Sequence, residues 1–284
     1  MIANYINRHR WSNLLSTVCL LILAQSAIAQ SELRVCADPD NLPFSNRKQE
    51  GFENKIATLL ADKLHAKLRY TWQRQRNGFI RQTLGAERCD LVMGVPHDYE
   101  RVLPTEPYYW SGYVFVTARN RHLDITSFDD PLLKQLKIGL HGFGNDGSNS
   151  PPASALALRG ITDNIVGYSL WGNGSAKNPQ GKIIDAVAKG EIDVAIVWGP
   201  IAGYYAKPYG QRLEIALAPH DPKLSDIPFD YEISMGVRKQ DQAFAAKLDG
   251  ILEQQHQKIH DILTAYHVPL IEPTINHDEA GTPE

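Results

Sequence analysis

Apolar, β-branched segments alternate with amphipathic segments along most of this chain. The segment 89–95 (CDLVMGV) is a continuous apolar run, which is typical of a strand buried on both faces. In 51–66, by contrast, apolar residues recur every three or four positions, which is the period of a helix with one buried face. Strands that alternate with helices in this way predict an α/β fold built on parallel strands.

The same reading covers the rest of the chain, in which no internal sequence repeat is visible. Strands are expected over 32–38, 67–72, 89–95, 113–118, 136–142, 165–168, 193–199, 213–219 and 233–239. Helices are expected over 51–66, 77–86, 152–158, 181–189, 201–209, 241–257 and 259–266.

The N-terminus reads as a targeting segment. Basic residues precede an apolar run over 14–24, and small residues follow at Ala27 and Ala29. We therefore expect a secretory signal peptide over 1–29, cleaved so that the mature chain begins at Gln30 in the periplasm. An uncleaved anchor is the alternative, but the run is shorter than the roughly 20 apolar residues of a spanning helix. No later segment is long and apolar enough to span a bilayer.

Composition excludes several classes of function. The chain has 284 residues, 43% apolar and 21% charged, which is ordinary for a globular protein. Its 29 basic and 32 acidic side chains give a net charge of -3. A surface that neutralises nucleic-acid phosphates is strongly basic, so we expect no nucleic-acid partner. No dinucleotide, Walker or cysteine-rich zinc motif is recognisable, so no cofactor or metal is expected.

Two cysteines, Cys36 and Cys89, belong to the expected mature chain. An even pair in an oxidising compartment favours one disulfide. Both, however, lie in strand-like apolar runs, where a free cysteine behaves as a small hydrophobic residue. Cys36 also lies late in its strand and Cys89 early in its own, so a parallel register would separate them. Both alternatives remain open.

The order of several segments resembles the type II periplasmic solute-binding proteins. These segments are LRVCADPDNLPFSN, GFENKIATLLADKL, CDLVMGV, EPYYWSGYVFV, LKIGLHG, GKIIDAVAKGEIDVAIV and ISMGVRKQDQAFAAKLDGIL. The resemblance implies a type II periplasmic binding protein fold, with two α/β lobes around a cleft joined by a two-crossing hinge. Lobe 1 would comprise 30–118 plus 230–270, lobe 2 would comprise 119–229, and 271–284 would be a polar tail.

A narrower resemblance is carried by RVCADPDNLPFSN, GFENKIA, LRYTWQRQRNGFIRQTL, CDLVMGVP, PYYWSGYVFV and DVAIVWGPIAGYYA. Together these resemble the quinoprotein-dehydrogenase-associated family of MxaJ or XoxJ type. The resemblance implies a non-catalytic accessory protein whose partner is a methanol or other alcohol dehydrogenase that uses pyrroloquinoline quinone (PQQ). None of the segments is a catalytic signature.

Turns that follow the expected strands form the candidate walls of the cleft, because ligands of open α/β sheets bind at the carboxyl ends of strands. The candidate residues for a ligand or partner are Asp38, Asn41, Phe44, Val95, His97, Asp98, Tyr99, Arg101, Tyr108, His141, Asn145, Trp198, Tyr204 and Tyr205.

These positions depart from the pattern of amino-acid receptors in the wider family. Gly94, Val95 and Pro96 follow the third strand without the usual hydroxyl residues, Arg101 lies too close to the following Pro-Tyr-Tyr segment, and Trp198 stands where an acid would bind the ammonium. A zwitterion buried without charged partners is unfavourable, so amino acids are not the expected ligands. The aromatic residues instead suggest a surface for a protein or an apolar ligand, or else lobe core.

Three classes of function compete. The leading hypothesis is the accessory protein that binds and helps to mature or activate a dehydrogenase. The second is a transporter-type receptor for a small ligand other than an amino acid. The third is an enzyme, for which His97, Asp98 and Glu100 form the only close acid-base cluster. A helical pair, His256 and His260, suggests a metal site less well than a solvated helix face.

Overall fold

The computed structural model describes residues 31–142, 150–170 and 179–272. The predicted signal peptide, the predicted start of the mature chain at Gln30, the candidate residue Asn145 and nearly all of the predicted tail lie outside these ranges. Within them, no helix has the length and apolar character that crossing a membrane requires.

Strands and helices alternate as the sequence predicts. The strands are β1 (Glu32–Ala37), β2 (Asp40–Asn41), β3 (Ser45–Asn46), β4 (Lys67–Trp72), β5 (Leu91–Pro96), β6 (Leu103–Pro104), β7 (Tyr109–Ala118), β8 (Ile138–Gly142), β9 (Ile165–Ser169), β10 (Val194–Trp198), β11 (Leu213–Leu217) and β12 (Asp230–Val237). The α-helices are α2 (Phe52–Lys63), α3 (Phe79–Gln82), α4 (Pro151–Leu158), α5 (Lys182–Lys189), α6 (Gly199–Ala206) and α7 (Gln242–Ala265). Short 3₁₀ turns lie at Arg119–Arg121, Pro131–Lys134, Pro179–Gly181, Lys207–Arg212 and Pro222–Leu224.

Three expected helices differ from the structure. The helix expected over 77–86 is only α3, because the left-handed Gly78 precedes it and the chain turns again after Gln82. The two helices expected over 241–257 and 259–266 are one helix, α7, since neither glycine nor proline interrupts the sequence between them.

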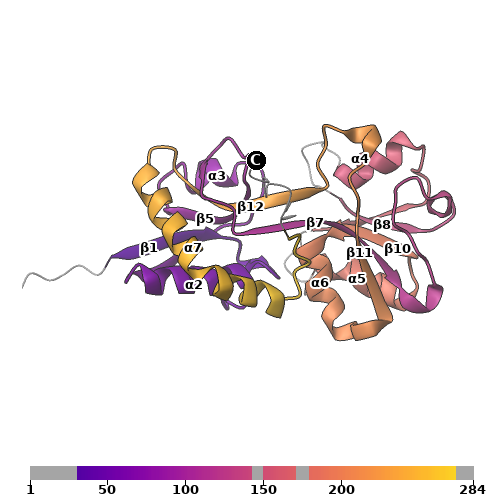
Figure 1. The fold of residues 1–284 in the computed structure, drawn as a ribbon, viewed down its shortest axis with the longest axis horizontal. Coiled ribbons are helices and arrows are strands. Elements are labelled where there is room, and N and C mark those ends of the chain that lie inside the picture. Colours follow the sequence, from indigo (N-terminus) through magenta and orange to yellow (C-terminus); the bar gives the residue numbers. More distant parts are fainter. Residues whose placement is uncertain (1–30, 143–149, 171–178, 273–284) are drawn as a thin grey trace, which may run out of the picture. The chain divides into compact units, whose positions relative to one another are not determined.

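The strands pair through one long strand, β7, in the order β4-β1-β5-β12-β7-β10-β8-β9. Strand β1 lies parallel to β4 and to β5, and β12 returns antiparallel to β5. The first residues of β7 pair with β12, from Tyr109 to Gly112, and the rest pair with β10 and β11 from Tyr113 onward. Figure 1 shows β7 running from β12 to β10. The partner of β7 therefore changes between Gly112 and Tyr113, and the lobe boundaries expected at 118 and 230 stay a prediction.

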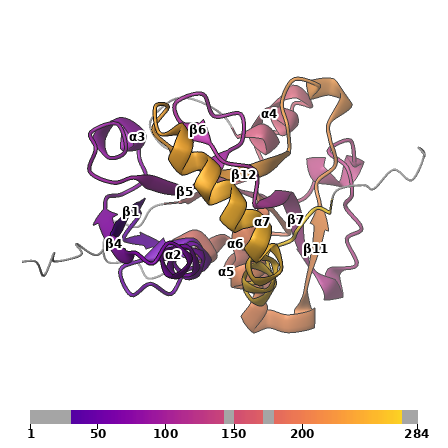
Figure 2. The same ribbon diagram turned by 60° about the vertical axis from the view of Figure 1, so that its left-hand side comes forward.

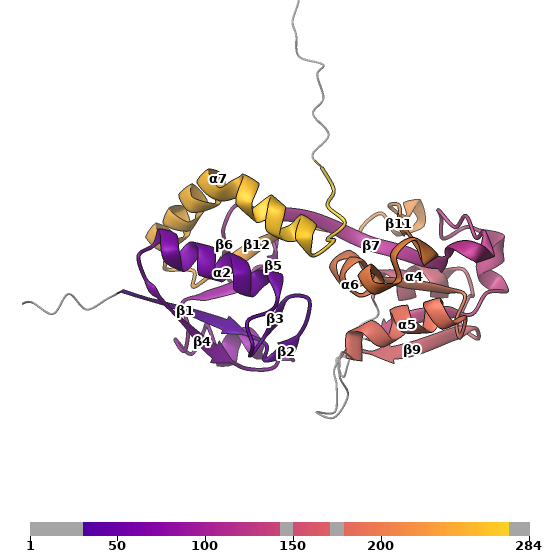
Figure 3. The ribbon, with the colours of Figure 1, turned by 90° about the horizontal axis from the view of Figure 1, so that it is seen from below.

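The first hydrophobic core lies around β1, β5 and β12. Helices α2 and α7 run side by side on this sheet and bury residues such as Phe52 and Leu248 against Met93 and Met235 (Figures 2 and 3). Each large apolar side chain buried in this way contributes about 1.5–3 kcal/mol to stability.

The second half of β7 separates two further cores, because its side chains alternate between faces. Phe115 packs against Phe128 on one face, where Phe128 also contacts Phe229 at 5.0 Å between ring centroids. Val114 and Val116 face α5 and α6 on the other.

The disulfide alternative for Cys36 and Cys89 is confirmed, with a Cα separation of 5.6 Å. The register argument against the bond was wrong because Cys89 is not in a strand. Strand β5 begins only at Leu91, and Cys36 pairs with Val92, so the preceding residues are free to turn back toward β1. The bonded pair is buried beneath α3.

Candidate functional site

Two adjoining cavities lie beside the strands β5, β7 and β10. The first has a volume of about 260 Å³ and is lined by Asn41, Phe44, Glu53, Gln75, Gly94, Val95, Pro96, Tyr109, Trp198, Tyr231 and Ile233. The second, of about 200 Å³, is lined by Asn41, Phe44, Gln75, Tyr113, His141, Ser150, Leu170, Gln180, Ile196, Val197, Trp198 and Ile201. The two therefore share four side chains, those of Asn41, Phe44, Gln75 and Trp198.

The loop that carries Asn41 and Phe44 is fixed to the start of α2. The side-chain oxygen of Asn54 accepts hydrogen bonds from the backbone N–H groups of Asn46 (3.1 Å) and Gly51 (3.2 Å). Gly51 is required by the close approach, because a Cβ there would lie 1.9 Å from the carbonyl oxygen of Phe44. The N-terminus of α2 thereby holds this loop against both cavities.

Asp38 holds the same loop from the other side. Its buried carboxylate accepts hydrogen bonds from the backbone N–H groups of Asp40 (2.9 Å) and Gln75 (2.7 Å). Burial raises the pKa of this carboxyl, and the two N–H donors counteract the shift. Asp38 lines neither cavity, so its place in the site is structural: it joins the turn after β1 to the turn after β4.

Glu53 is the acidic residue among the described side chains that line the first cavity. It lies in the first turn of α2, where acidic residues are favoured by the helix dipole, and is only 6% exposed. Burial, assisted by the charge of Asp38, raises the pKa of its carboxyl to about 8. Oε1 lies where only a glycine leaves room, since a Cβ on Gly94 would be 2.5 Å away.

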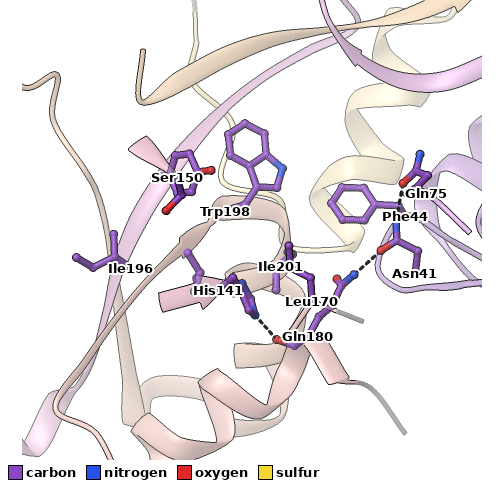
Figure 4. Close-up of a pocket in the computed structure, with 12 residues that line it drawn as sticks. Asn41, Phe44, Gln75, His141, Ser150, Leu170, Gln180, Ile196, Trp198 and Ile201 are labelled. Carbon is purple, nitrogen blue, oxygen red and sulfur yellow. Dashed lines mark hydrogen bonds between the residues drawn. The ribbon is translucent and has the colours of Figure 1, made fainter. Parts of the chain in front are cut away.

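A chain of amide contacts spans the second cavity (Figure 4). Asn41 Nδ2 donates to Gln75 Oε1 (2.9 Å), and Gln180 Nε2 donates to Asn41 Oδ1. The backbone carbonyl of Gln180 accepts from His141 Nε2 (3.1 Å). Gln180 Oε1 is buried without a hydrogen-bond partner among the described residues. The second cavity therefore offers polar but uncharged groups.

His141 is neutral over most of the pH range. It lies at the end of β8 and is 7% exposed, and burial lowers the pKa of its imidazole to about 4.

Trp198 lines both cavities. It ends β10, as its place in the sequence predicted, and its indole packs edge-on against Tyr113 (5.6 Å between centroids) and Tyr231 (5.8 Å). The ring contacts the first and second hydrophobic cores. Aromatic pairs of this geometry add about 0.5–1.5 kcal/mol beyond burial, so Trp198 has a packing role besides lining the cavities.

The structure brings five of the predicted site residues to the cavities: Asn41, Phe44, Val95, His141 and Trp198. The turn after β5 does not reach them. His97, Asp98 and Arg101 are exposed, and Tyr99 packs against the core beneath α3. His97 Nδ1 instead contacts the hydroxyl of Ser234 (2.9 Å).

The predicted aromatic residues Tyr108, Tyr204 and Tyr205 also lie outside both cavities. Tyr108 is core, with its hydroxyl donating to the carbonyl of Met93 (3.0 Å). Tyr205 donates to the carbonyl of Leu42 (3.1 Å), and Tyr204 stacks on Tyr266. Their roles in binding stay predictions.

Several lining residues were missed by sequence reasoning. Gln75 follows β4, so the rule that ligands meet the ends of strands would have found it if it had been applied to that strand. Glu53 reads in sequence as an ordinary first-turn acid of a helix. Gln180 and Tyr231 carry no local signal, since their positions depend on long-range packing.

His256 and His260 lie on α7 beside Pro107 and Tyr108, where they line a separate surface cavity of about 290 Å³. In the part of the chain that the structure describes, no three His, Cys, Asp or Glu side chains gather as metal ligands would.

Comparison with known proteins assigns the fold and the family. Residues 33–268 match the model of the bacterial extracellular solute-binding proteins, family 3, and the chain belongs to this family, whose fold is that of the type II periplasmic binding proteins.

Within the family the chain belongs to the MxaJ/XoxJ type. Protein MoxJ of Methylorubrum extorquens is 34% identical over 252 residues, which are 84% of this chain and 81% of that protein. The crystal structure of the periplasmic binding protein XoxJ from Methylobacterium extorquens AM1 is 37% identical, with a TM-score of 0.69 over 85% of this chain and 100% of that one. The crystal structure of MxaJ from Methlophaga aminisulfidivorans MPT is 28% identical, with a TM-score of 0.74 over 84% and 100%.

Proposed function

We propose that this protein is a non-catalytic periplasmic accessory protein of methanol or other alcohol oxidation. It binds a PQQ-dependent alcohol dehydrogenase and helps to mature or activate it. The observation that carries the proposal is the similarity to MoxJ, XoxJ and MxaJ, which extends over 81% of MoxJ and 100% of the two crystal structures. The extracellular character of the wider family supports the periplasmic location.

The chemistry of the two cavities supports a departure from amino-acid transport. The described lining residues include no lysine or arginine. A ligand carboxylate buried there would lack the charge-assisted donors that compensate its loss of water. Arg101, the one arginine that sequence reasoning considered for this role, is exposed outside both cavities.

A non-catalytic role agrees with how the titratable groups are distributed. The cluster that an enzyme would have used, His97, Asp98 and Glu100, is exposed in the turn after β5. Among the described lining residues, the acid Glu53 and the histidine His141 belong to different cavities, so they do not converge on one ligand position. General acid-base catalysis needs both groups within reach of the same substrate.

A receptor for a small ligand other than an amino acid is the second candidate. The two cavities favour it, because they are concave, largely apolar and carry a few placed polar groups. Ligand binding and dehydrogenase binding are compatible properties, so each needs its own assay.

The test is reconstitution with the dehydrogenase. The mature chain is mixed with the apo form of a PQQ-dependent alcohol dehydrogenase from the same organism, PQQ and the metal ion of that enzyme. We expect a complex by size-exclusion chromatography and a larger active fraction in dye-linked alcohol oxidation than without the protein. An amino-acid receptor of the same family serves as control. Absence of both a complex and an activity change at tens of micromolar protein would overturn the proposal.

A further inference from the structure

Glu53 carries a buried carboxyl group for which the described residues provide no polar partner. The residue is only 6% exposed and lines the first cavity. Its backbone N–H donates to the carbonyl of Phe44 (3.0 Å), but no described residue donates a hydrogen bond to its carboxyl group. A buried carboxyl normally has hydrogen-bond or cationic partners, because desolvation without them costs several kcal/mol.

The groups that face Glu53 do not supply the missing charge. They are Asp38 from the turn after β1, Tyr70 from β4, and Tyr108 and Tyr109 from β7 and the segment before it. One is an acid, and the tyrosines have pKa values raised by burial, so they are neutral at physiological pH. Nothing in this set balances a negative charge on Glu53.

Aromatic side chains form much of the remaining wall of the cavity. Phe44, Tyr109, Trp198 and Tyr231 line it together with Glu53. The negative faces of such rings attract cations. A carboxyl group surrounded by several aromatic rings is the arrangement that recognises quaternary and other highly alkylated ammonium ions, which have few or no N–H donors and are weakly hydrated.

We propose that the first cavity is a binding site for a small organic cation, an alkylammonium or quaternary ammonium ion, with Glu53 as its counter-ion and the four aromatic residues as its cage. The volume of about 260 Å³ accommodates a ligand of a few carbon atoms. Gly94 belongs to the site because its missing side chain leaves the space that the carboxyl group occupies. The proposal concerns this chain alone and holds whether or not a dehydrogenase binds.

Binding of a cation must be linked to loss of a proton. In the empty site the carboxyl group is protonated at neutral pH, since burial raises its pKa to about 8. A cation stabilises the ionised form, so each bound ligand releases up to one proton from Glu53 to the buffer. Affinity should therefore rise with pH from 6 to 8 and level off above that.

The test compares two ligands of nearly equal shape by titration calorimetry. Choline carries the charge, and 3,3-dimethyl-1-butanol replaces its nitrogen by carbon. We expect choline to bind at least tenfold more tightly at pH 8, with a heat that depends on the ionisation enthalpy of the buffer because a proton is released. Equal affinity for the two ligands, or no choline binding at millimolar concentration, would overturn the proposal.

Variants identify the counter-ion. Glu53→Gln should lower choline affinity at least tenfold and abolish the proton release, whereas Asp62→Asn should change neither, since Asp62 is an exposed acid on the same helix. Gly94→Ala is the second variant: its Cβ would lie 2.5 Å from Glu53 Oε1, so the carboxyl group must shift and choline binding should weaken. Retained choline affinity in Glu53→Gln contradicts the assignment.

Discussion

The two cavities share four lining side chains yet differ in their response to charge. The first contains Glu53, a carboxyl group that burial keeps protonated near neutrality, and the second contains His141, an imidazole that burial keeps unprotonated. In the first cavity, a cationic ligand would favour the ionised, negatively charged form of Glu53. The other presents the amide chain of Asn41 and Gln180 and stays neutral. Adjacent sites on one scaffold can therefore select ligands by different chemistry.

The same difference gives the cavities opposite effects on stability as pH changes. The pKa of Glu53 is raised, so folding retains a proton that the unfolded chain has lost, and stability falls as pH rises from about 4.5 to 8. The pKa of His141 is lowered, so between the two pKa values the unfolded chain binds a proton at this residue and the folded chain does not. Stability therefore falls as pH drops from about 6.5 to 4. A substitution at Glu53 or at His141 can remove each contribution to the pH dependence separately.

The largest expected effect is that of Glu53→Gln. The substitution removes the cost of ionising a buried carboxyl group, which reaches about 5 kcal/mol above pH 8 for a shift of this size. We expect the variant to be more stable than the natural chain at pH 9, with the gain shrinking toward zero near pH 4.5. Urea unfolding at several pH values measures the difference.

Asp62→Asn is again the matched control, because Asp62 is an exposed acid on the same helix. A stability difference between Glu53→Gln and the natural chain that does not vary with pH would show that the buried carboxyl group is not the titrating group.

His141→Gln should act in the opposite direction along the pH axis. A neutral side chain removes the penalty for protonation, which amounts to about 3 kcal/mol at pH 4. Loss of the contact with the carbonyl of Gln180 lowers stability by an amount that does not depend on pH. The informative quantity is therefore the slope of the free energy of unfolding between pH 4 and 6.5. An exposed histidine, His122, provides the control through His122→Gln.

Trp198→Ala tests the wall that the cavities share. The ring is half-buried and packs on Tyr113 and Tyr231, so its removal should join the two cavities and lower stability by roughly 3 kcal/mol. Trp198→Phe should recover most of the loss, because a ring still fills the position. A fully stable Trp198→Ala protein would mean that the indole serves a partner rather than the core.

The sequence predicted the alternation of strands and helices because each of these elements carries its own period of apolar residues. Helix α2 and strands β5 and β10 illustrate this, since one face or both faces of each are buried. The break predicted between the two C-terminal helices was wrong. No helix-breaking residue lies between them, and α7 is continuous.

The candidate site was harder to predict. Residues at the ends of strands, such as His141 and Trp198, were found because topology alone brings such positions together. Glu53 was missed because its burial results from Gly94 and from rings of distant segments. The disulfide could not be decided from the sequence, because it depends on where β5 begins. The apolar run 89–95 does not show that the strand starts only at Leu91.

The smallest effect concerns a surface outside both cavities. Tyr204 is half-buried on α6, and its ring stacks on Tyr266 at the end of α7, 5.8 Å between centroids. If the dehydrogenase contacts this pair, Tyr204→Ala should weaken the complex by about 1 kcal/mol or more, a fivefold rise in Kd, while choline binding in the first cavity stays unchanged. Tyr204→Phe keeps the ring and should bind normally. Interferometry with immobilised dehydrogenase gives the two Kd values, and thermal unfolding confirms that the variants are folded. A folded Tyr204→Ala protein with unchanged Kd would contradict an anchoring role for Tyr204, because truncating an anchoring aromatic residue weakens binding.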